Sequence, residues 1–450
     1  MYLLRAPLRD YAWGSVTLLA ELQDRVPTGR PEAELWMGAH PSAPAGAVPA
    51  GDPQDDPLPL NELLGADPDR LLGEASRFGR LPYLVKLLAA GRPLSIQAHP
   101  TLDQARAGFA AEEAAGVPVS APHRNYKDDN HKPEMVVALT PFAALCGFRS
   151  AADTGTSFRR LADVLAENTG LAENVGLAED TGHDDGPAGP ADTPAEIPAG
   201  SLAETVAGYA DRLLGSGDGV DPAAESAAIE SVFCDLLDPD GNWAAGTWVR
   251  AAVAALAKAP RVLDEDLNLA TAVGIAEHYP QDPGVLVSVL LHRLDLAPGQ
   301  AIHLPAGNVH AYLYGLGVEV MAASDNVLRG GLTPKHVDIP ELRKVVAFES
   351  VPVPYSTPAS DGPGHLVFRP PFEEFQVERL DLPAADGRAL SARGPVLAVC
   401  TAGRVRVSAG SDTAELAPGE SVFLGADEPA ATVHGSEGAD EGTLFAVTLP

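Results

Sequence analysis

A chain of 450 residues is long enough for two or three domains. Its composition, 45% hydrophobic and 21% charged with a mean hydropathy near zero, is that of a soluble globular protein. The formal net charge of −31 argues against a nucleic-acid partner or an anionic membrane surface.

Three scattered cysteines, Cys146, Cys234 and Cys400, are too few for a disulfide framework or a cysteine-rich zinc site. Cys146 and Cys400 stand in apolar runs and are expected to be buried free thiols. Residues 1–7 lack the apolar core of a signal peptide, and no apolar run reaches the roughly 18 residues needed to span a membrane. We therefore expect a cytoplasmic protein.

Two aromatic stretches open the chain, at residues 9–15 and 34–41, and each places a tryptophan near glycine and a charged residue. They could equally be turn packing or the wall of a site. A loop rich in Pro and Asp at residues 46–59 and a helical stretch near 60–74 follow. Residues 81–88 then form an apolar run that leads into the first motif.

The first stretch with recognisable chemistry is PLSIQAHP, at residues 93–100. Because alternate residues of an extended strand point to the same side, Ser95, Gln97 and His99 would share one face. After this motif the pattern becomes helical, from residue 101 to about 115, and Thr101 is a suitable N-cap.

The second stretch is NHKPEM, at residues 130–135, in which Lys132 and Glu134 would share a face. Together the two stretches offer an imidazole, a carboxylate and an amide oxygen beside an ammonium group. That set suits a divalent cation bound by oxygen and nitrogen. Each histidine alone would more often be structural, so the prediction depends on the combination.

Between about residues 150 and 265 the hydrophobic period changes to 3.6, which predicts a helical insert. Its helices are expected at residues 158–165, 201–214, 223–237 and 248–257. Three hexapeptides that begin LAE repeat in tandem from residue 165, and a stretch rich in Pro, Gly and acidic residues follows. Such repeats are too short for a solenoid core, so we expect residues 167–200 to be a disordered surface loop without chemistry.

After the insert, residues 285–291, 292–296 and 300–304 are predicted to be short strands. The sequence LPAGNVHAY then places a turn of Pro, Gly and Asn before His310, at the start of another strand. Such a turn presents the following side chain at the rim of a β-barrel, and His310 is therefore the predicted last ligand.

A turn-and-strand pattern occurs twice, as LAPGQAIHL at residues 296–304 and as LAPGESVFL at residues 416–424. The repetition predicts two related β-barrels of jelly-roll type. His310 lies fourteen residues after the start of the first copy, and the same step in the second copy reaches Ala430. Only the first barrel is therefore expected to bind metal.

The motifs PLSIQAHP, NHKPEM and LPAGNVHAYL, with EVMAASDNVLRGGLTPK at residues 319–335, closely resemble those of type I mannose-6-phosphate isomerases. They occur in that family's order, and the resemblance extends from the N-terminus to about residue 350. It implies a mainly β fold with an α insert: two jelly-roll, cupin-like barrels plus a helical domain. The expected parts are a discontinuous catalytic metal-binding barrel (1–149 and 266–350), the helical insert (150–265) and a degenerate C-terminal barrel (351–450).

The resemblance also assigns roles to residues. It implies one Zn²⁺ per chain, bound by Gln97, His99, Glu134 and His310. With a single carboxylate among these ligands, the site would keep a net charge of about +1, which suits Lewis-acid chemistry better than a structural role. The implied substrate-binding residues are Trp13, Glu34, Ser95, Lys132, Tyr312, Asp325 and Lys335.

Two residues are expected to take part in catalysis. Arg329 matches the arginine that the family treats as catalytic, although without the resemblance we would expect it to form an ion pair with Asp325. Glu319 is the first choice for the proton-transfer base, with Lys132 or a metal-bound water as open alternatives.

The implied activity is the interconversion of mannose 6-phosphate and fructose 6-phosphate through an enediolate, which would feed GDP-mannose synthesis. We expect a monomer that takes a small sugar phosphate and has no nucleic-acid or membrane partner. Two other classes stay open. A metal-dependent cupin oxygenase would need O₂ and iron, and a non-catalytic sugar-phosphate-binding regulator would bind its ligand without turnover.

Overall fold

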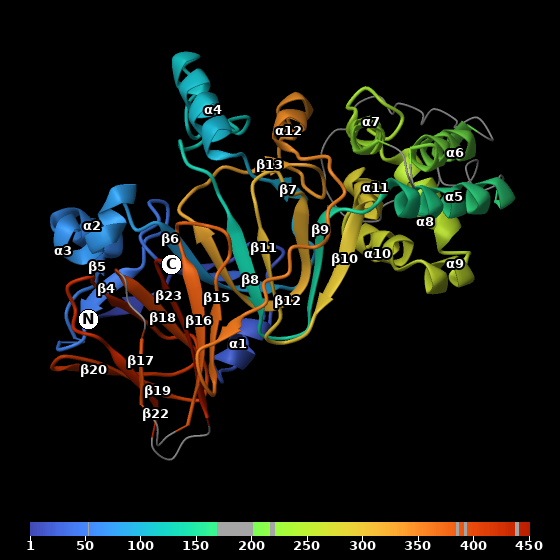
Figure 1. The fold of residues 1–450 in the computed structure, drawn as a ribbon. Helices are drawn as coiled ribbons and strands as arrows, with labels where there is room; N and C mark the ends of the chain where they lie inside the picture. Colours follow the sequence, from blue (N-terminus) through green and yellow to red (C-terminus); the bar gives the residue numbers. More distant parts are fainter. Residues whose placement is uncertain (53, 169–200, 217–220, 384–386, 391–393, 437–440) are drawn as a thin grey trace, which may run out of the picture.

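The computed structural model describes residues 1–52, 54–168, 201–216, 221–383, 387–390, 394–436 and 441–450. This part of the chain is mainly β with several helices: sheets occupy the centre and one side of the molecule, and a group of helices lies on the other side (Figure 1). Residues 169–200, which hold most of the expected disordered loop, lie outside the described residues.

The central sheet is organised around one long strand, β12 (His310–Ala322). This strand pairs antiparallel with β6 (Tyr83–Ala90), β7 (Gln97–Ala98), β8 (Glu134–Ala138) and β9 (Phe142–Phe148). The other strands of the sheet are β2 (Leu8–Arg9), β3 (Glu34–Met37), β10 (Leu291–Leu296), β11 (Ala301–Leu304) and β13 (Leu328–Arg329). Strand β12 changes partners at Gly315, whose φ of +122° and close approach to the Pro141 carbonyl require glycine.

A second sheet joins the two ends of the chain. Strand β1 (Tyr2–Arg5) pairs with β21 (Ser421–Leu424), so N-terminal strands complete the C-terminal sheet. Its remaining strands are β4 (Gly46–Pro49), β5 (Leu58–Pro59), β14 (Ala359–Ser360), β15 (His365–Phe368), β16 (Gln376–Leu382), β18 (Val396–Ala402) and β23 (Gly442–Thr448). A smaller sheet contains β17 (Arg388–Ala389), β19 (Val405–Ala409), β20 (Asp412–Leu416) and β22 (Thr432–Gly435).

The expected two jelly-roll barrels are not confirmed, because the strands of the described residues pair in open sheets. The two larger sheets nevertheless share one apolar core. Val137 and Val318 of the central sheet belong to the same buried cluster as Phe375, Val399 and Phe445 of the C-terminal part. The C-terminal part is therefore packed against the strands that carry the site.

Helices form where the sequence predicted them. The expected insert (150–265) contains α5 (Ala151–Glu167), α6 (Ser201–Leu214), α7 (Pro222–Leu237), α8 (Thr247–Leu256) and α9 (Pro260–Glu265), and α10 (Leu267–Ala276) follows its expected end. Elsewhere the helices are α1 (Leu18–Leu22), α2 (Leu60–Ala66), α3 (Pro68–Leu72), η1 (Gly73–Phe78), α4 (Leu102–Ala114) and α12 (Ile339–Val345). Helix α4 begins with the expected cap, since Thr101 and Gln104 form a reciprocal capping box.

One predicted strand is wrong. Residues 285–291 form the short helix α11 (Gly284–Val287) and the 3₁₀ turn η2 (Ser288–Leu290), and β10 begins only at Leu291. The segment is apolar and buried throughout, and a short buried run has no periodicity that separates helix from strand. The expected burial of the Cys146 and Cys400 thiols is confirmed. Among the described residues, no helix is both long and apolar enough to cross a membrane.

Candidate metal centre and substrate cavity

Three strand ends bring the predicted metal donors together. Glu134 opens β8 and lies opposite Leu304 of β11, and the turn after β11 returns the chain to His310 at the start of β12. Gly307 makes that turn possible with a φ of +79°. His99 follows directly after β7, whose Gln97 lies opposite His310.

The donor atoms of His99, Glu134 and His310 all lie within 4.8 Å of one another, and the three residues are buried. The Nε2 atom of His99 lies 3.3 Å from Oε1 of Glu134, and the Nε2 atom of His310 lies 3.3 Å from Oε2 of the same carboxylate. The three side chains therefore converge on one point.

Backbone carbonyls fix which ring nitrogen of His99 and of His310 faces the point where the three donors converge. The Nδ1 atom of His99 lies 2.7 Å from the carbonyl oxygen of Asn326, and Nδ1 of His310 lies 3.2 Å from that of Asn308. A carbonyl can only accept, so both Nδ1 atoms carry the proton and both Nε2 atoms present lone pairs. Within the described residues neither Nε2 has a hydrogen-bond partner. Two lone pairs and a carboxylate that face one another fit a divalent cation between them.

The charges around Glu134 also fit a divalent cation at this centre. The ammonium of Lys132 lies 2.8 Å from Oε1 of Glu134. Burial alone would raise the pKa of Glu134, but Lys132 and the two histidines hold it well below its ordinary value. Burial, with the charge of Lys132, lowers the pKa of His99 to about 4. A carboxylate and neutral imidazoles are the forms that bind metal.

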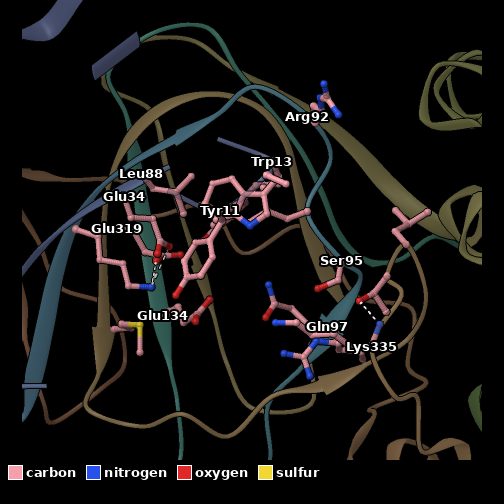
Figure 2. Close-up of a pocket in the computed structure, with 18 of the residues that line it drawn as sticks. Tyr11, Trp13, Glu34, Leu88, Arg92, Ser95, Gln97, Glu134, Glu319 and Lys335 are labelled. Atoms are coloured by element: carbon pink, nitrogen blue, oxygen red, sulfur yellow. Dashed lines mark hydrogen bonds and ion pairs between the residues drawn. The ribbon is translucent and has the colours of Figure 1, made fainter. Parts of the chain in front are cut away.

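A cavity of about 540 Å³ adjoins this centre, within the roughly 300–1,000 Å³ typical of small-molecule sites. All nine predicted catalytic and substrate-binding residues line it, together with Gln97 and Glu134. The nine are Trp13, Glu34, Ser95, Lys132, Tyr312, Glu319, Asp325, Arg329 and Lys335. Figure 2 shows the stacked rings of Tyr11 and Trp13 between the carboxylates of Glu34 and Glu319 on one side and Ser95 and Lys335 on the other.

One face of the sheet forms the acidic side of the cavity. Lys86 of β6 lies directly opposite Glu319 of β12, with its Nζ atom 2.9 Å from Glu319 and 3.3 Å from Glu34. The indole of Trp36 donates a hydrogen bond of 2.8 Å to Glu34. Burial raises the pKa of Glu319, although Lys86 opposes the shift, whereas the carboxylates raise the pKa of Lys86 despite its burial. Lys86 is therefore a permanent cation beside a carboxylate that can take up a proton.

The other side of the cavity carries unpaired positive charge. Burial lowers the pKa of Arg329, and burial together with the charges of Arg329 and Lys127 lowers that of Lys335. No ion pair among the described residues involves Arg329 or Lys335. The ion pair between Arg329 and Asp325 that was the alternative interpretation does not form, because Asp325 contacts His40 at 3.4 Å instead.

A buried polar network holds the loops that flank His99. The Asn326 side chain accepts a hydrogen bond from the Lys127 backbone N–H at 2.7 Å, and it donates to the backbone carbonyls of Asp128 and Asn130, each at 2.8 Å. The same residue supplies the carbonyl that orients His99. Asn326 is wholly buried. Because this network holds Asn326 in place, the orientation of the His99 ring depends on it.

Sequence reasoning missed four residues that shape the cavity or its centre: Lys86, Trp36, His40 and Asn326. Lys86 did carry a signal, since it is the one charged residue in the otherwise apolar strand YLVKLLAA. Trp36 and His40 belong to residues 34–41, which the sequence indicated only as a possible wall of a site. Asn326 could not be found from local pattern, because its partners lie some two hundred residues earlier in the chain.

The fold, the enclosed three-donor centre and the adjoining cavity define a metal-dependent enzyme with a small-molecule site. A family model for the catalytic domain of phosphomannose isomerase type I matches residues 1–151. The mannose-6-phosphate isomerase of Escherichia coli strain K12 is 36% identical over 433 residues, which cover 95% of both chains. The chain belongs to the type I phosphomannose isomerase family.

Solved structures agree with this assignment. A mutant of phosphomannose isomerase from Salmonella typhimurium shares 33% identity over 100% of this chain and 99% of its own, with a TM-score of 0.79. The same identity, coverage and TM-score describe a zinc-bound holo form of mannose 6-phosphate isomerase.

Proposed function

We propose that this chain is a zinc-dependent isomerase that interconverts mannose 6-phosphate and fructose 6-phosphate. The observation that carries the proposal is a buried His99–Glu134–His310 donor set that adjoins one cavity, and this cavity contains a carboxylate with a raised pKa and two cations without an ion pair among the described residues. Aldose–ketose isomerisation of a sugar phosphate can use all three. Membership of the isomerase family supports the same reaction.

The cationic side of the cavity would bind the phosphate. Arg329 and Lys335 have no ion pair within the described chain, so their charges are available to a dianion. A planar guanidinium can hold two phosphate oxygens at once, and an ammonium adds a point charge. This local charge offsets the net −31 of the whole chain, which would otherwise repel the substrate.

Glu319 is our proposed base. To convert the aldose, its carboxylate would remove the proton from C2 of mannose 6-phosphate and deliver a proton to C1 of the enediolate, while the proton of the C2 hydroxyl passes to O1. A base works best when its pKa lies near the working pH, and burial moves the pKa of Glu319 in that direction. The Lys86 cation limits the shift, so the carboxylate form stays accessible.

One Zn²⁺ per chain is the proposed cofactor, with Gln97 as a fourth ligand next to His99, Glu134 and His310. When bound, zinc would act as a Lewis acid that stabilises negative charge on the enediolate oxygens. The amide of Gln97 supports this assignment because it lines the cavity from β7, opposite His310. Lys132, beside Glu134, adds a further positive charge toward the same oxygens.

Two histidines and a carboxylate also fit the iron site of an oxygenase. Here that alternative is weaker, because a cavity that also contains Glu319, Lys86, Arg329 and Lys335 is equipped for proton transfer on an anionic substrate.

We also propose the organisation expected from the sequence: a cupin-like unit at 1–149 and 266–350 that the helical insert at 150–265 interrupts, and a second cupin-like unit at 351–450. The chain would act as a cytoplasmic monomer. Its product in the mannose direction would feed GDP-mannose synthesis.

Isomerisation in deuterium oxide tests the chemistry. Transfer through an enediolate and a carboxylate base exposes the moving proton to solvent, so deuterium is expected at C2 of mannose 6-phosphate formed from fructose 6-phosphate. Turnover without any solvent deuterium at C2 would favour a hydride shift between C1 and C2 over a carboxylate base. Equal turnover under anaerobic conditions is expected, and dependence on O₂ would favour the oxygenase.

A further inference from the structure

An ion pair connects the C-terminal part of the chain to the segment that carries the metal carboxylate. The Nε2 atom of His131 lies 2.6 Å from Oε1 of Glu374. Glu374 is buried, with 6% of its surface exposed, and it lies just before β16 in the C-terminal sheet. The two residues are 243 positions apart in the chain, so the contact is entirely tertiary.

The Glu374 end of this contact is firmly anchored. Its neighbour Phe375 is fully buried and belongs to the apolar cluster that the two large sheets share. That cluster also contains Met135 and Val137 of β8. The backbone of Glu374 is therefore fixed relative to the strand that Glu134 opens.

The His131 end leads directly to the site. Lys132 follows it and contacts Glu134 at 2.8 Å, and Glu134 is the central donor of the metal centre. On the preceding side, the carbonyl of Asn130 accepts hydrogen bonds from Asn326 and Ser324. Between Asn130 and Glu134 the chain is not part of a strand: the Pro133 carbonyl accepts a backbone hydrogen bond of 3.0 Å from Ala322, and side-chain contacts hold the residues before it.

We propose that Glu374 is a positioning residue for the active site, which acts through His131 to fix Lys132 and Glu134. The C-terminal sheet would then contribute to catalysis as well as to the core. Groups that orient metal ligands from outside typically change metal affinity about 10- to 100-fold when removed, and small displacements of catalytic groups are similarly costly. The proposal rests on the proposed function, because it assumes that Lys132 and Glu134 work at the metal centre.

The test compares two buried glutamates of the C-terminal part, Glu374 and Glu378. Glu374→Ala removes the proposed contact, and Glu374→Gln keeps its size while removing its charge. Glu378→Gln is the control, since Glu378 is also buried and pairs with a histidine, His365, at 2.9 Å. Glu378 also accepts a hydrogen bond from Gln376, and His365 contacts Asp361; none of these four residues lines the cavity. Zinc dissociation constants, from competition with a chromophoric chelator, and kcat would be measured on folded protein.

We expect Glu374→Ala to raise the zinc dissociation constant and to lower kcat by about tenfold or more, with a smaller effect in Glu374→Gln. Glu378→Gln should leave both within about twofold of wild type, even if its melting temperature falls. If Glu374→Ala does not fold, Glu374→Gln decides.

Wild-type values for both quantities in the Glu374 variants, or equal losses in Glu378→Gln, would overturn the inference. Absence of turnover in the zinc-loaded wild type would instead refute the proposed function, so the two failures are distinguishable.

Discussion

Lys86 lies opposite Glu319 across two neighbouring strands, and their charged atoms are 2.9 Å apart in the interior of the cavity. Both side chains are more than nine-tenths buried, and Glu34 lies 3.3 Å from the same ammonium. One cation therefore compensates two buried carboxylates. Removing it would leave both charges without compensation in a poorly solvated place.

Replacement of Lys86 by methionine should therefore destabilise the protein by about 3 to 5 kcal/mol, the usual cost of breaking a buried ion pair from one side. Chemical denaturation of the zinc-loaded protein measures the change. Lys344→Met is the matched control, because Lys344 is exposed and its contact with Glu341 lies at the surface. Adding Glu319→Gln to Lys86→Met should recover part of the loss. A Lys86→Met protein as stable as wild type would show that the carboxylates do not need the cation.

The pH dependence of turnover should report Glu319. Its carboxylate is the proposed base, so kcat/KM should fall as pH decreases through its pKa, by about tenfold per pH unit. Because burial raises this pKa, the fall should begin at a higher pH than for an exposed glutamate. Loss of the Lys86 cation should raise the pKa of Glu319 further, and the fall in kcat/KM should then begin at a still higher pH. Zinc content must be measured at each pH, since protonation of the histidine ligands would also abolish activity. An acid limb that is unchanged in Lys86→Met would contradict this assignment.

Asn326 should control metal affinity without being a ligand. Asn326→Ala removes the bonds that hold the loops beside His99, so the zinc dissociation constant should rise about 10- to 100-fold. Competition titration with a chelator measures it. Asn268→Ala, which removes a side-chain bond to the Leu291 carbonyl near the helical insert, is the control and should bind zinc normally. Unchanged affinity in Asn326→Ala would mean that backbone packing alone orients His99.

Lys335 should act on substrate binding. Lys335→Ala is expected to raise KM for mannose 6-phosphate about tenfold or more, the loss expected for a charge-assisted contact worth at least about 1.5 kcal/mol. Its kcat should change much less, and the effect should shrink at high salt. Lys344→Ala should leave KM unchanged. If Lys335→Ala lowered kcat at constant KM, Lys335 would belong to the catalytic step and not to phosphate binding.

Much of the site could be predicted because its residues occur in short motifs with strand spacing. His99 and Glu134 stand next to a proline at the end or start of a strand, and His310 opens a strand three residues after Gly307; these signals are local. Their approach to within 4.8 Å is not local, since it depends on how β12 pairs with several other strands. What indicated that these residues meet was the order of their motifs along the chain, which is that of the type I isomerases. The periodicity of the motifs did not indicate it.

The residues that sequence reasoning missed owe their roles to tertiary contacts. Lys86 matters because strand register places Glu319 opposite it, and Asn326 because it joins two distant loops. The strand prediction for residues 285–291 was wrong for a different reason. This segment is buried on all sides, so it shows no alternation of polar and apolar residues. The pairing of β1 with β21 likewise could not be read from either strand alone.

The most direct test of the whole account is turnover of mannose 6-phosphate to fructose 6-phosphate before chelation, after chelation, and after zinc is restored. We expect activity to disappear with the chelator and to return with zinc, and His310→Ala, whose ligand atom is lost, to show no such recovery at the same zinc concentration. Undiminished turnover in the fully chelated protein, or no turnover in the zinc-loaded wild type, would contradict the account.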